Sequence, residues 1–216
     1  MFKDRYDAAK ELADKLINYS GANTVVIGIP RGGAVIASTI AEKLGCIWDL
    51  VIPRKIGAPY NSELAIGAVV QDGTILLNEK LINSLAISKE YIEKEKEKQM
   101  KEIQRRLEVY RGNMSYPELE GKTVILVDDG IATGFTAKAA LKSLNKQKPL
   151  KLILAVPVSP PETVYELQNF VDEVICVLKP ETFYAVGQFY EDFSQTTDEE
   201  VICLFQKQHK SSLKRR

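Results

Sequence analysis

Apolar runs that alternate with helical patterns restrict the fold of this chain more than any other feature. The run TVVIGIP at residues 24–30 is rich in β-branched side chains, and the helical pattern AVIASTIAEKLG follows it at 34–45, where Gly45 is expected to end the helix. A second apolar run, WDLVIPRKI, occupies residues 48–56 and is expected to form one strand. The alternation predicts an α/β fold, a parallel sheet with helices on both faces.

The second half of the chain repeats this alternation. Further apolar runs lie at residues 123–129, 150–158 and 172–178, and a helical pattern follows the first of them at 136–145. We expect each run to add a strand to the sheet, because short connections between strands and helices are typical of parallel α/β folds.

Three further helices are predicted along the chain. Ser/Thr-x-x-Glu capping boxes at 159–162 and 197–200 mark the starts of two of them. An amphipathic helix opens the chain, where apolar residues recur at helical spacing (Ala9, Leu12, Ala13, Leu16 and Ile17). No linker, repeat or low-complexity segment interrupts the sequence, so we expect a single domain over residues 1–216.

One insertion separates the two halves. AIGAVV and TILLN flank Gln71-Asp72-Gly73, and Asp-Gly favours a hairpin. A long helix is then predicted at about 88–111, with a narrow apolar stripe (Ile92, Met100, Ile103, Leu107 and Tyr110). Its many Lys and Glu residues are mixed in sign and often four apart, which indicates a solvated face. The same helix offers a surface for a second copy of the chain, so a homodimer is one expectation.

Composition excludes several classes of partner. Lys+Arg and Asp+Glu both total 29, so no overall charge points toward nucleic acid or a membrane surface. No apolar run reaches the roughly 18 residues that span a bilayer, and the first residues lack the apolar core of a signal peptide. Cys46, Cys176 and Cys203 lie far apart in apolar neighbourhoods, which predicts reduced, buried thiols. We therefore expect a cytoplasmic protein.

The strand ends carry residues suited to ligand binding. In a parallel sheet, ligands bind outside the carboxyl ends of the strands. Cations, acids and glycines lie at these ends: Arg31, Gly32 and Gly33 after the first run, Arg54 and Lys55 near the end of the second, and Asp128 and Asp129 at the end of the third. We expect these residues to converge on one edge of the sheet.

The segment after the two acids has almost no bulky side chains. It lies between a strand and a helix and consists of Gly130, Ile131, Ala132, Thr133, Gly134, Phe135 and Thr136. Backbone N–H groups at a helix N-terminus bind anions, and the two threonines add hydroxyl donors, so this segment predicts a phosphate-binding loop. It fits neither the Walker A nor the GxGxxG pattern. The alternative is an ordinary strand-to-helix turn with a Thr cap.

Two adjacent carboxylates beside a phosphate need partners of their own. The vicinal hydroxyls of a sugar would satisfy them, and so would Mg²⁺, unless one Asp only caps the loop. Arg31 with Gly32 and Gly33 indicates a site for a second anion, although the glycines could simply allow close helix packing. The whole layout fits a phosphorylated ribose that carries a pyrophosphate.

These residues also carry a family resemblance. VILVDDGIATGFT resembles the signature of type I phosphoribosyltransferases, in which two acids precede a small Thr/Gly loop. Residues 30–33 fall where that family has its pyrophosphate loop, and residues 54–63 where it has a mobile catalytic loop. RKIGAPYNSELAIGAV and AVGQFYEDFSQTTDEEV are similar to a bacterial and archaeal branch of predicted phosphoribosyltransferases of unassigned acceptor. The resemblance implies the type I fold, with the long inserted helix and a small C-terminal hood at about 181–208.

The resemblance further implies an activity. Such enzymes move the ribosyl phosphate of 5-phosphoribosyl 1-pyrophosphate (PRPP) to a nitrogenous base with Mg²⁺ as cofactor, often in nucleotide salvage. Asp128 and Asp129 would hold the ribose hydroxyls and the metal, residues 130–136 the 5-phosphate, and residues 31–33 the pyrophosphate. Arg54, Lys55 and Glu63 would join the acids as catalytic residues, with segment 56–63 closing as a lid, although local capping or pairing is the favoured role for Glu63.

The acceptor side of the site is less clearly marked. The candidates for contact with the base are Lys179, Tyr184, Tyr190 and Asp192. An aromatic mini-core beneath the last helix is the alternative role for most of this segment.

Two other functions fit parts of the sequence. The first is a PRPP- or nucleotide-sensing regulator on the same fold; its DNA-binding forms usually carry a helix-turn-helix or a basic face, and neither is apparent here. The second is a phosphatase with an aspartyl nucleophile, which needs Asp-x-Asp spacing, whereas Asp128 and Asp129 are adjacent. The transferase is therefore the leading hypothesis.

Overall fold

The central element is a five-stranded parallel sheet. This computed structural model describes residues 1–112 and 117–213. The strand order is β2-β1-β6-β7-β8, and every neighbouring pair is parallel. The strands are β1 (Thr24–Gly28), β2 (Ile47–Leu50), β6 (Thr123–Val127), β7 (Lys151–Val158) and β8 (Glu173–Leu178). The predicted α/β class is confirmed.

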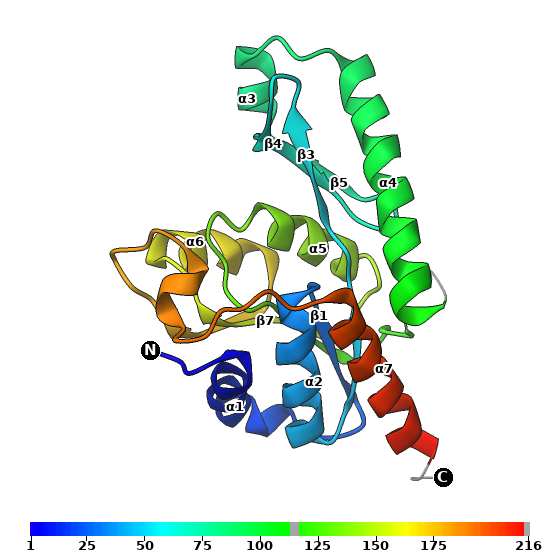
Figure 1. Cartoon of the computed structure of the whole chain (residues 1–216), viewed down its shortest axis with the longest axis vertical. Helices are drawn as coiled ribbons and strands as arrows, with labels where there is room; N and C mark the ends of the chain where they lie inside the picture. Colours follow the sequence, from blue (N-terminus) through cyan, green and yellow to red (C-terminus); the bar gives the residue numbers. More distant parts are fainter. Residues whose placement is uncertain (113–116, 214–216) are drawn as a thin grey trace.

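Helices cover both faces of this sheet, as predicted (Figure 1). Side chains alternate between the faces of a strand, and along β6 Ile125 joins the core beneath one set of helices while Val124 and Leu126 join the core beneath the other. The first set contains α1 (Arg5–Lys15) and α2 (Gly32–Leu44), and the second contains α5 (Phe135–Asn145) and α6 (Pro161–Leu167). Short 3-10 turns follow α1 and α6, at Ile17–Tyr19 and Gln168–Phe170.

The sequence prediction of one strand at residues 48–56 is wrong. The run contributes β2 to the main sheet, and after residues 51–53 it contributes β3 (Arg54–Ala58) to a second sheet. At the junction the Ile52 amide donates to Gln71 Oε1 at 2.8 Å, and Pro53 follows. Val51, Ile52 and Ile56 are nearly inaccessible to solvent. The apolar run therefore indicates that these residues are buried, but it does not indicate that they belong to one sheet.

The second sheet is antiparallel and has the order β3-β4-β5. Its other strands are β4 (Asn61–Val69) and β5 (Ile75–Leu77), and the predicted Asp-Gly hairpin joins them, with Gly73 at φ +79°. The expectation of a loop at 54–63 is not met, because β3 and β4 pair into a hairpin that turns at Tyr60. With α3 (Glu79–Ser84) and α4 (Lys89–Arg111), this sheet forms an arm that rises from the main body (Figure 1).

The long helix α4 (Lys89–Arg111) closely matches its prediction. Ser88 caps its start, and Gly112 ends it at φ +73°. Most of the predicted apolar stripe is buried and Met100 is partly buried, which places this face against the second sheet and the last helix (Ile92, Ile103, Leu107 and Tyr110 are the buried members).

The C-terminal segment joins the start of the chain. It contains a 3-10 turn at Val186–Phe189 and the helix α7 (Asp198–Leu213). The capping box at 197–200 is confirmed, because the Thr197 amide donates to Glu200 Oε2 and the Glu200 amide donates to Thr197 Oγ1. Phe2 forms an isolated parallel bridge with Tyr190, so the first residues and the C-terminal segment meet at this point.

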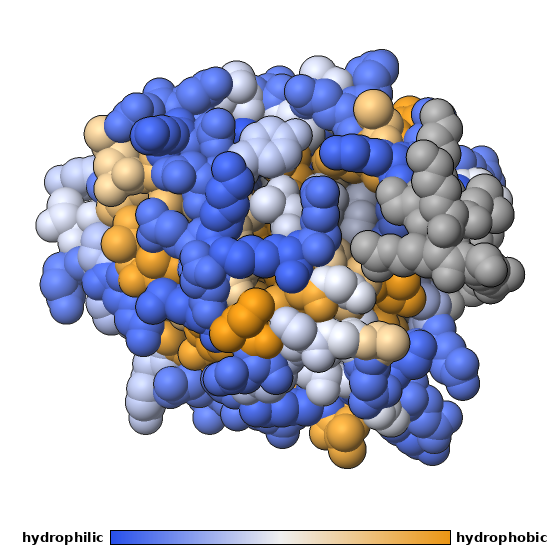
Figure 2. Space-filling view, turned by 90° about the horizontal axis from the view of Figure 1, so that it is seen from below, coloured by the Kyte–Doolittle hydropathy of each residue, from blue (hydrophilic) through white to orange (hydrophobic). Residues whose placement is uncertain are grey.

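The surface is predominantly hydrophilic on the face that Figure 2 shows, where hydrophobic residues form only small patches. Among the helices of the described residues, none has the length and apolar character needed to cross a bilayer. The prediction of buried thiols holds partly for Cys46 and Cys176, which are half-buried, and is wrong for Cys203, which is exposed on α7. Residue 203 lies on the outward side of an amphipathic helix, where its side chain faces solvent.

The capping box predicted at 159–162 is wrong. Pro160 is the N-cap of α6 and Pro161 is its first residue, so the predicted Pro at the helix start is confirmed while Ser159 lies before the cap. The Ser159 amide donates to the Leu178 carbonyl oxygen at 3.2 Å, which directs the residue into the sheet. Its hydroxyl is inaccessible and finds no hydrogen-bond partner in the described part of the chain.

We predict that Ser159→Ala leaves the free energy of unfolding unchanged or raises it by up to about 1 kcal/mol, because a buried hydroxyl without a partner is unfavourable. Thr197→Ala is the matched control: it removes a capping hydroxyl that is engaged, and should cost about 1 kcal/mol. Urea denaturation of both variants tests this, and a loss at Ser159 equal to that at Thr197 would contradict it.

Candidate active site

The site lies where β1 and β6 run side by side in the main sheet. The chain leaves β1 toward β2 on one side and leaves β6 toward β7 on the other, so the connections diverge at this pair. Such a switch point leaves a crevice at the carboxyl ends of the strands, where α/β proteins bind ligands. Gly28 and Val127 are the last paired residues of the two strands. Residues 31–33 and the acids 128–129 therefore follow the same edge of the sheet.

The glycines after β1 make direct contact with the acids after β6. A Cβ atom on Gly32 would overlap the Asp129 carboxylate, and one on Gly33 would lie 3.0 Å from the Val127 carbonyl oxygen and 3.2 Å from Asp128 Cα. A Cβ on Gly28 would in turn lie 2.5 Å from the Gly33 carbonyl oxygen. The close packing considered for Gly32 and Gly33 is therefore confirmed: they allow α2 to pack closely and bring its N-terminus to the acids.

Asp129 has two partners from distant parts of the chain. Arg5 Nε donates to Asp129 Oδ2 at 2.7 Å, and the side chains of this ion pair are only 11% and 16% exposed. Tyr190 donates its hydroxyl to the Asp129 carbonyl oxygen at 2.5 Å. Burial raises the pKa of the Asp129 carboxyl, while Arg5 acts in the opposite direction. Arg5 is a site residue that was not predicted from the sequence.

Asp128 is in a less favourable environment. Its Oδ1 accepts the amide of Asp129 at 2.9 Å, just before the loop at 130–136. Burial and the neighbouring Asp129 carboxylate raise the pKa of Asp128 well above its ordinary value. A carboxylate held in this way gains stability from a cation or from hydroxyl donors.

The segment 130–136 forms a loop with an anchored base and an exposed tip. Gly130 is buried, and the Ile131 amide donates to the Val158 carbonyl oxygen at 3.0 Å. Ala132 and Thr133 are exposed, and the Ala132 carbonyl oxygen accepts the Thr163 hydroxyl at 2.7 Å.

The exposed tip lies just before helix α5. Gly134 adopts φ +70° as the N-cap, which needs a residue without a Cβ, and α5 begins at Phe135. Phe135 and Thr136 therefore belong to the first helical turn. The arrangement sets exposed backbone and a threonine at a helix N-terminus, which favours an anion.

Arg31 lies next to the last helix. Its guanidinium NH1 is 3.8 Å from Asp198 Oδ1, and the same carboxylate oxygen accepts the Tyr110 hydroxyl at 2.6 Å. The Arg31 side chain is 32% exposed, so its guanidinium remains accessible to an anion at the N-terminus of α2. The ion pair with Asp198 is long and weak.

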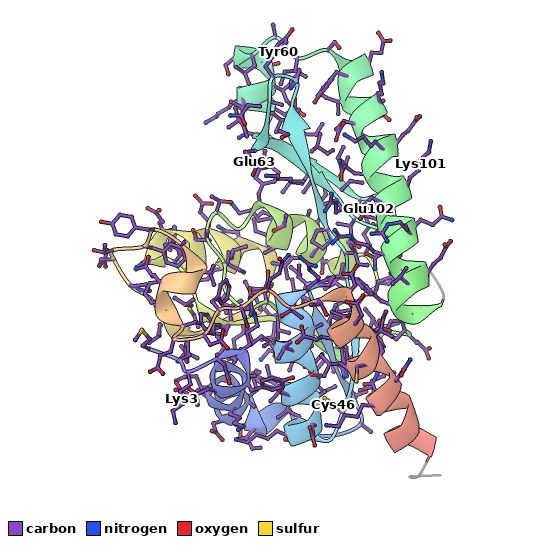
Figure 3. All side chains as sticks on the ribbon, in the orientation of Figure 1. Lys3, Cys46, Tyr60, Glu63, Lys101 and Glu102 are labelled. Atoms are coloured by element: carbon purple, nitrogen blue, oxygen red, sulfur yellow. The ribbon has the colours of Figure 1, made fainter. Side chains whose placement is uncertain are left out.

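The remaining catalytic candidates lie on the arm. Arg54 Nε donates to Gln99 Oε1 on α4 at 2.9 Å, in a groove lined otherwise by charged residues of that helix. Lys55 pairs with Glu63 across the β3–β4 hairpin at 2.7 Å, and Figure 3 shows Glu63 and Tyr60 on this arm. Within the described chain, no hydrogen bond or ion pair joins these residues to Asp128 or Asp129. The structure therefore does not place Arg54 and Lys55 at the edge of the main sheet, because β3 belongs to the second sheet.

The acceptor-side candidates fall into two groups. Tyr190 is buried between Phe2 and Phe193, with ring centroids 5.4 and 4.9 Å away, which matches the mini-core alternative. Lys179 and Tyr184 are exposed, and Asp192 is exposed with Oδ1 accepting the Ser194 amide at 2.9 Å.

Comparison with known proteins agrees with this geometry. Residues 61–194 match the family described as the phosphoribosyl transferase domain. A predicted phosphoribosyl transferase of Mycobacterium tuberculosis, Rv0571c, is 39% identical over 210 residues, which are 97% of this chain and 47% of that protein. The chain thus spans about half the length of that relative.

Solved structures show the same fold. TT1426 from Thermus thermophilus superposes with a TM-score of 0.81 at 38% identity, over 95% of this chain and 98% of that one. A purine phosphoribosyltransferase from Pyrococcus horikoshii shares the fold with a TM-score of 0.50 at 18% identity, over 89% of this chain and 93% of that one.

We predict that Asp128→Asn stabilises the protein at pH 7. In the folded state the pKa of Asp128 is raised above its ordinary value of 3.8. The folded protein therefore loses stability as the pH rises from that ordinary pKa through the folded-state pKa, and at neutral pH the charged carboxylate is disfavoured. Asn keeps the acceptor for the Asp129 amide. We expect the melting temperature to rise by at least about 2 °C at pH 7, with the gain shrinking toward pH 4. The exposed Asp14→Asn is the control; an unchanged or lower melting temperature for Asp128→Asn contradicts the prediction.

Proposed function

The chain belongs to the phosphoribosyltransferase family, and from that premise we propose that it transfers the 5-phosphoribosyl group of PRPP to a nitrogenous base and releases pyrophosphate. One observation carries this proposal. The acids 128–129, the glycine loop after β1 and the exposed loop before α5 meet at the switch point of the sheet. A diol, a monophosphate and a pyrophosphate on one ribose need these three surfaces side by side.

Each part of PRPP has a matching set of groups. Backbone N–H groups of the loop tip and the Thr133 hydroxyl suit the 5-phosphate at the start of α5. The two carboxylates suit the ribose hydroxyls as acceptors. Arg31 and the N-terminus of α2 suit the pyrophosphate, whose departure they would assist because their positive charge is preorganised.

The donor set also fits Mg²⁺ that arrives with the substrate. Mg²⁺ is usually held by one or two carboxylates together with substrate phosphates and waters, and Asp128 and Asp129 provide the carboxylates. Among the described residues no cluster of three or more acidic, His or Cys side chains could hold a metal by itself. When bound, the ion would supply positive charge to the leaving pyrophosphate.

The acceptor is proposed to be a purine or pyrimidine base that approaches from the C-terminal segment. Tyr184 is 87% exposed and could stack on a flat ring, while Lys179 and Asp192 are exposed polar groups near it in the chain. Tyr190 is left with a supporting role, because its ring and hydroxyl are both engaged within the protein.

A PRPP-sensing protein without turnover is the second candidate. One observation favours it: Arg54, Lys55 and Glu63 pair on the arm and not at the acids. The transferase requires that the remaining groups, or a closing motion of the arm, supply the missing catalytic charge.

Turnover separates the two functions. We expect incubation with PRPP, Mg²⁺ and a panel of purine and pyrimidine bases to release pyrophosphate and form the corresponding nucleotide with at least one base. Chromatography of the products and a pyrophosphate assay measure this. Binding of PRPP without product on any base would favour the sensor, and a protein that neither PRPP nor nucleoside monophosphates stabilise would exclude both.

Residue substitutions test the site assignment. Asp129→Asn and Thr133→Ala should each weaken binding of Mg²⁺-PRPP by about 1–3 kcal/mol, as expected for loss of a charge-assisted contact. Isothermal titration calorimetry measures the affinities. Asp14→Asn and Ser84→Ala, at exposed positions outside the site, are the matched controls and should bind like the wild type. Wild-type affinity in both site variants would show that the assignment is wrong.

A further inference from the structure

Arg5 connects the acid of the site to the C-terminal segment. Its Nε donates to Asp129 Oδ2 at 2.7 Å, and its NH1 donates to the Ser194 carbonyl oxygen at 2.7 Å. The guanidinium carbon lies 4.0 Å from the centre of the Phe193 ring, a cation–π contact. The planar guanidinium of Arg5 thus contacts an acid at the end of β6 and two neighbouring residues of the segment 190–194, which we call the acceptor-side loop.

Backbone hydrogen bonds fix the position from which Arg5 reaches the site. The Phe2 amide donates to the Phe189 carbonyl oxygen, and the Glu191 amide donates to the Phe2 carbonyl oxygen, both at 2.9 Å. The Asp192 amide donates to the Lys3 carbonyl oxygen at 2.9 Å. The first residues of the chain therefore run beside the acceptor-side loop; Figure 3 shows Lys3 there, next to the start of α1.

Helix stability does not explain an arginine at this position. Arg5 is the first residue of α1, where a positive charge opposes the helix dipole, and Asp4 and Asp7 already supply the cap and the favourable charge. The Arg5 side chain is only 11% exposed, so it gives up hydration as well. Its contacts with Asp129, Ser194 and Phe193 have to offset both costs.

The contacts also determine the direction of the Asp129 carboxylate. Oδ2 is enclosed by Arg5 and by Gly32, where no Cβ fits. The backbone of the same residue is held by Tyr190 through the carbonyl oxygen. One carboxylate oxygen and the backbone of Asp129 are thus fixed, while 16% of its side-chain surface stays exposed.

We infer that Arg5 is a positioning residue that orients Asp129 for the ribose hydroxyls and couples this acid to the acceptor-side loop at 190–194. The inference rests on the proposed PRPP site and deepens it. Without Arg5, the carboxylate is free to turn, and the loop keeps its contact with the Asp129 backbone through Tyr190 but loses its contact with the carboxylate. Arg5 therefore acts on the ligand through Asp129.

A double-mutant cycle tests this route of action, since the effect of Arg5→Gln should depend on an intact Asp129. Calorimetry with Mg²⁺-PRPP and with ribose 5-phosphate should show about a tenfold loss of affinity or more for Arg5→Gln in the wild-type background. In the Asp129→Asn background the same substitution should change the affinity by less than about threefold. Arg5→Lys should fall between, because Lys keeps the charge but cannot donate in two directions from one plane.

The control variant addresses the loss of charge alone. Lys10→Gln removes a positive charge from the exposed face of the same helix and should leave both affinities unchanged. Equal losses for Arg5→Gln in both backgrounds would show simple attraction of an anionic ligand and overturn the inference, as would wild-type affinity in Arg5→Gln. If Arg5→Gln does not fold, as judged by circular dichroism, wild-type affinity in Arg5→Lys likewise overturns it. A wild-type protein that fails to bind Mg²⁺-PRPP overturns the proposed function first, and this inference with it.

Discussion

The adjacency of the carboxyl ends of β1 and β6 is the constraint on which the site depends. Gly28 pairs with Val127 as the last register of these strands, and the Ile29 amide still donates to the Val127 carbonyl oxygen at 3.0 Å. The two loops therefore leave the sheet in contact with one another. Gly33 has to pack against this edge, and Gly32 has to pack against Asp129, so neither position tolerates a side chain without displacing an acid.

This arrangement is electrostatically costly without a ligand. Two neighbouring carboxylates are largely removed from water, and burial raises the pKa of both. Arg5 compensates Asp129 directly, whereas Asp128 accepts a hydrogen bond from a backbone amide, which carries no net charge. A ligand that brings hydroxyl donors, or a cation, lowers the free energy of the two buried carboxylates. The destabilisation that they cause in the unliganded protein therefore contributes to the free energy of ligand binding.

The features that could be predicted from the sequence were those set by local pattern. Hydrophobic periodicity, helix-capping residues and glycines predicted the strands of the main sheet, the long helix and the loop before α5. Each of these elements depends on residues that are near one another in the chain. The division of residues 48–58 between two sheets was not predictable from hydrophobicity, because both strands are buried. Arg5 was missed for a related reason: its partners lie 124 and 189 residues away, and its only local signal is a cation in a first helical turn.

The same long-range contacts explain why the C-terminal segment was hard to interpret alone. Its aromatic residues are equally compatible with a base pocket and with a mini-core, and the structure shows Tyr190 in a mini-core, with its hydroxyl on the Asp129 backbone. Phe2 completes that cluster from the opposite end of the sequence. Because the cluster and Arg5 both end on Asp129, a displacement of the acceptor-side loop would be transmitted to the acid that we assign to the ribose. In the proposed transferase, recognition of the acceptor and binding of the donor would then be linked through Asp129, whose partners come from both ends of the chain.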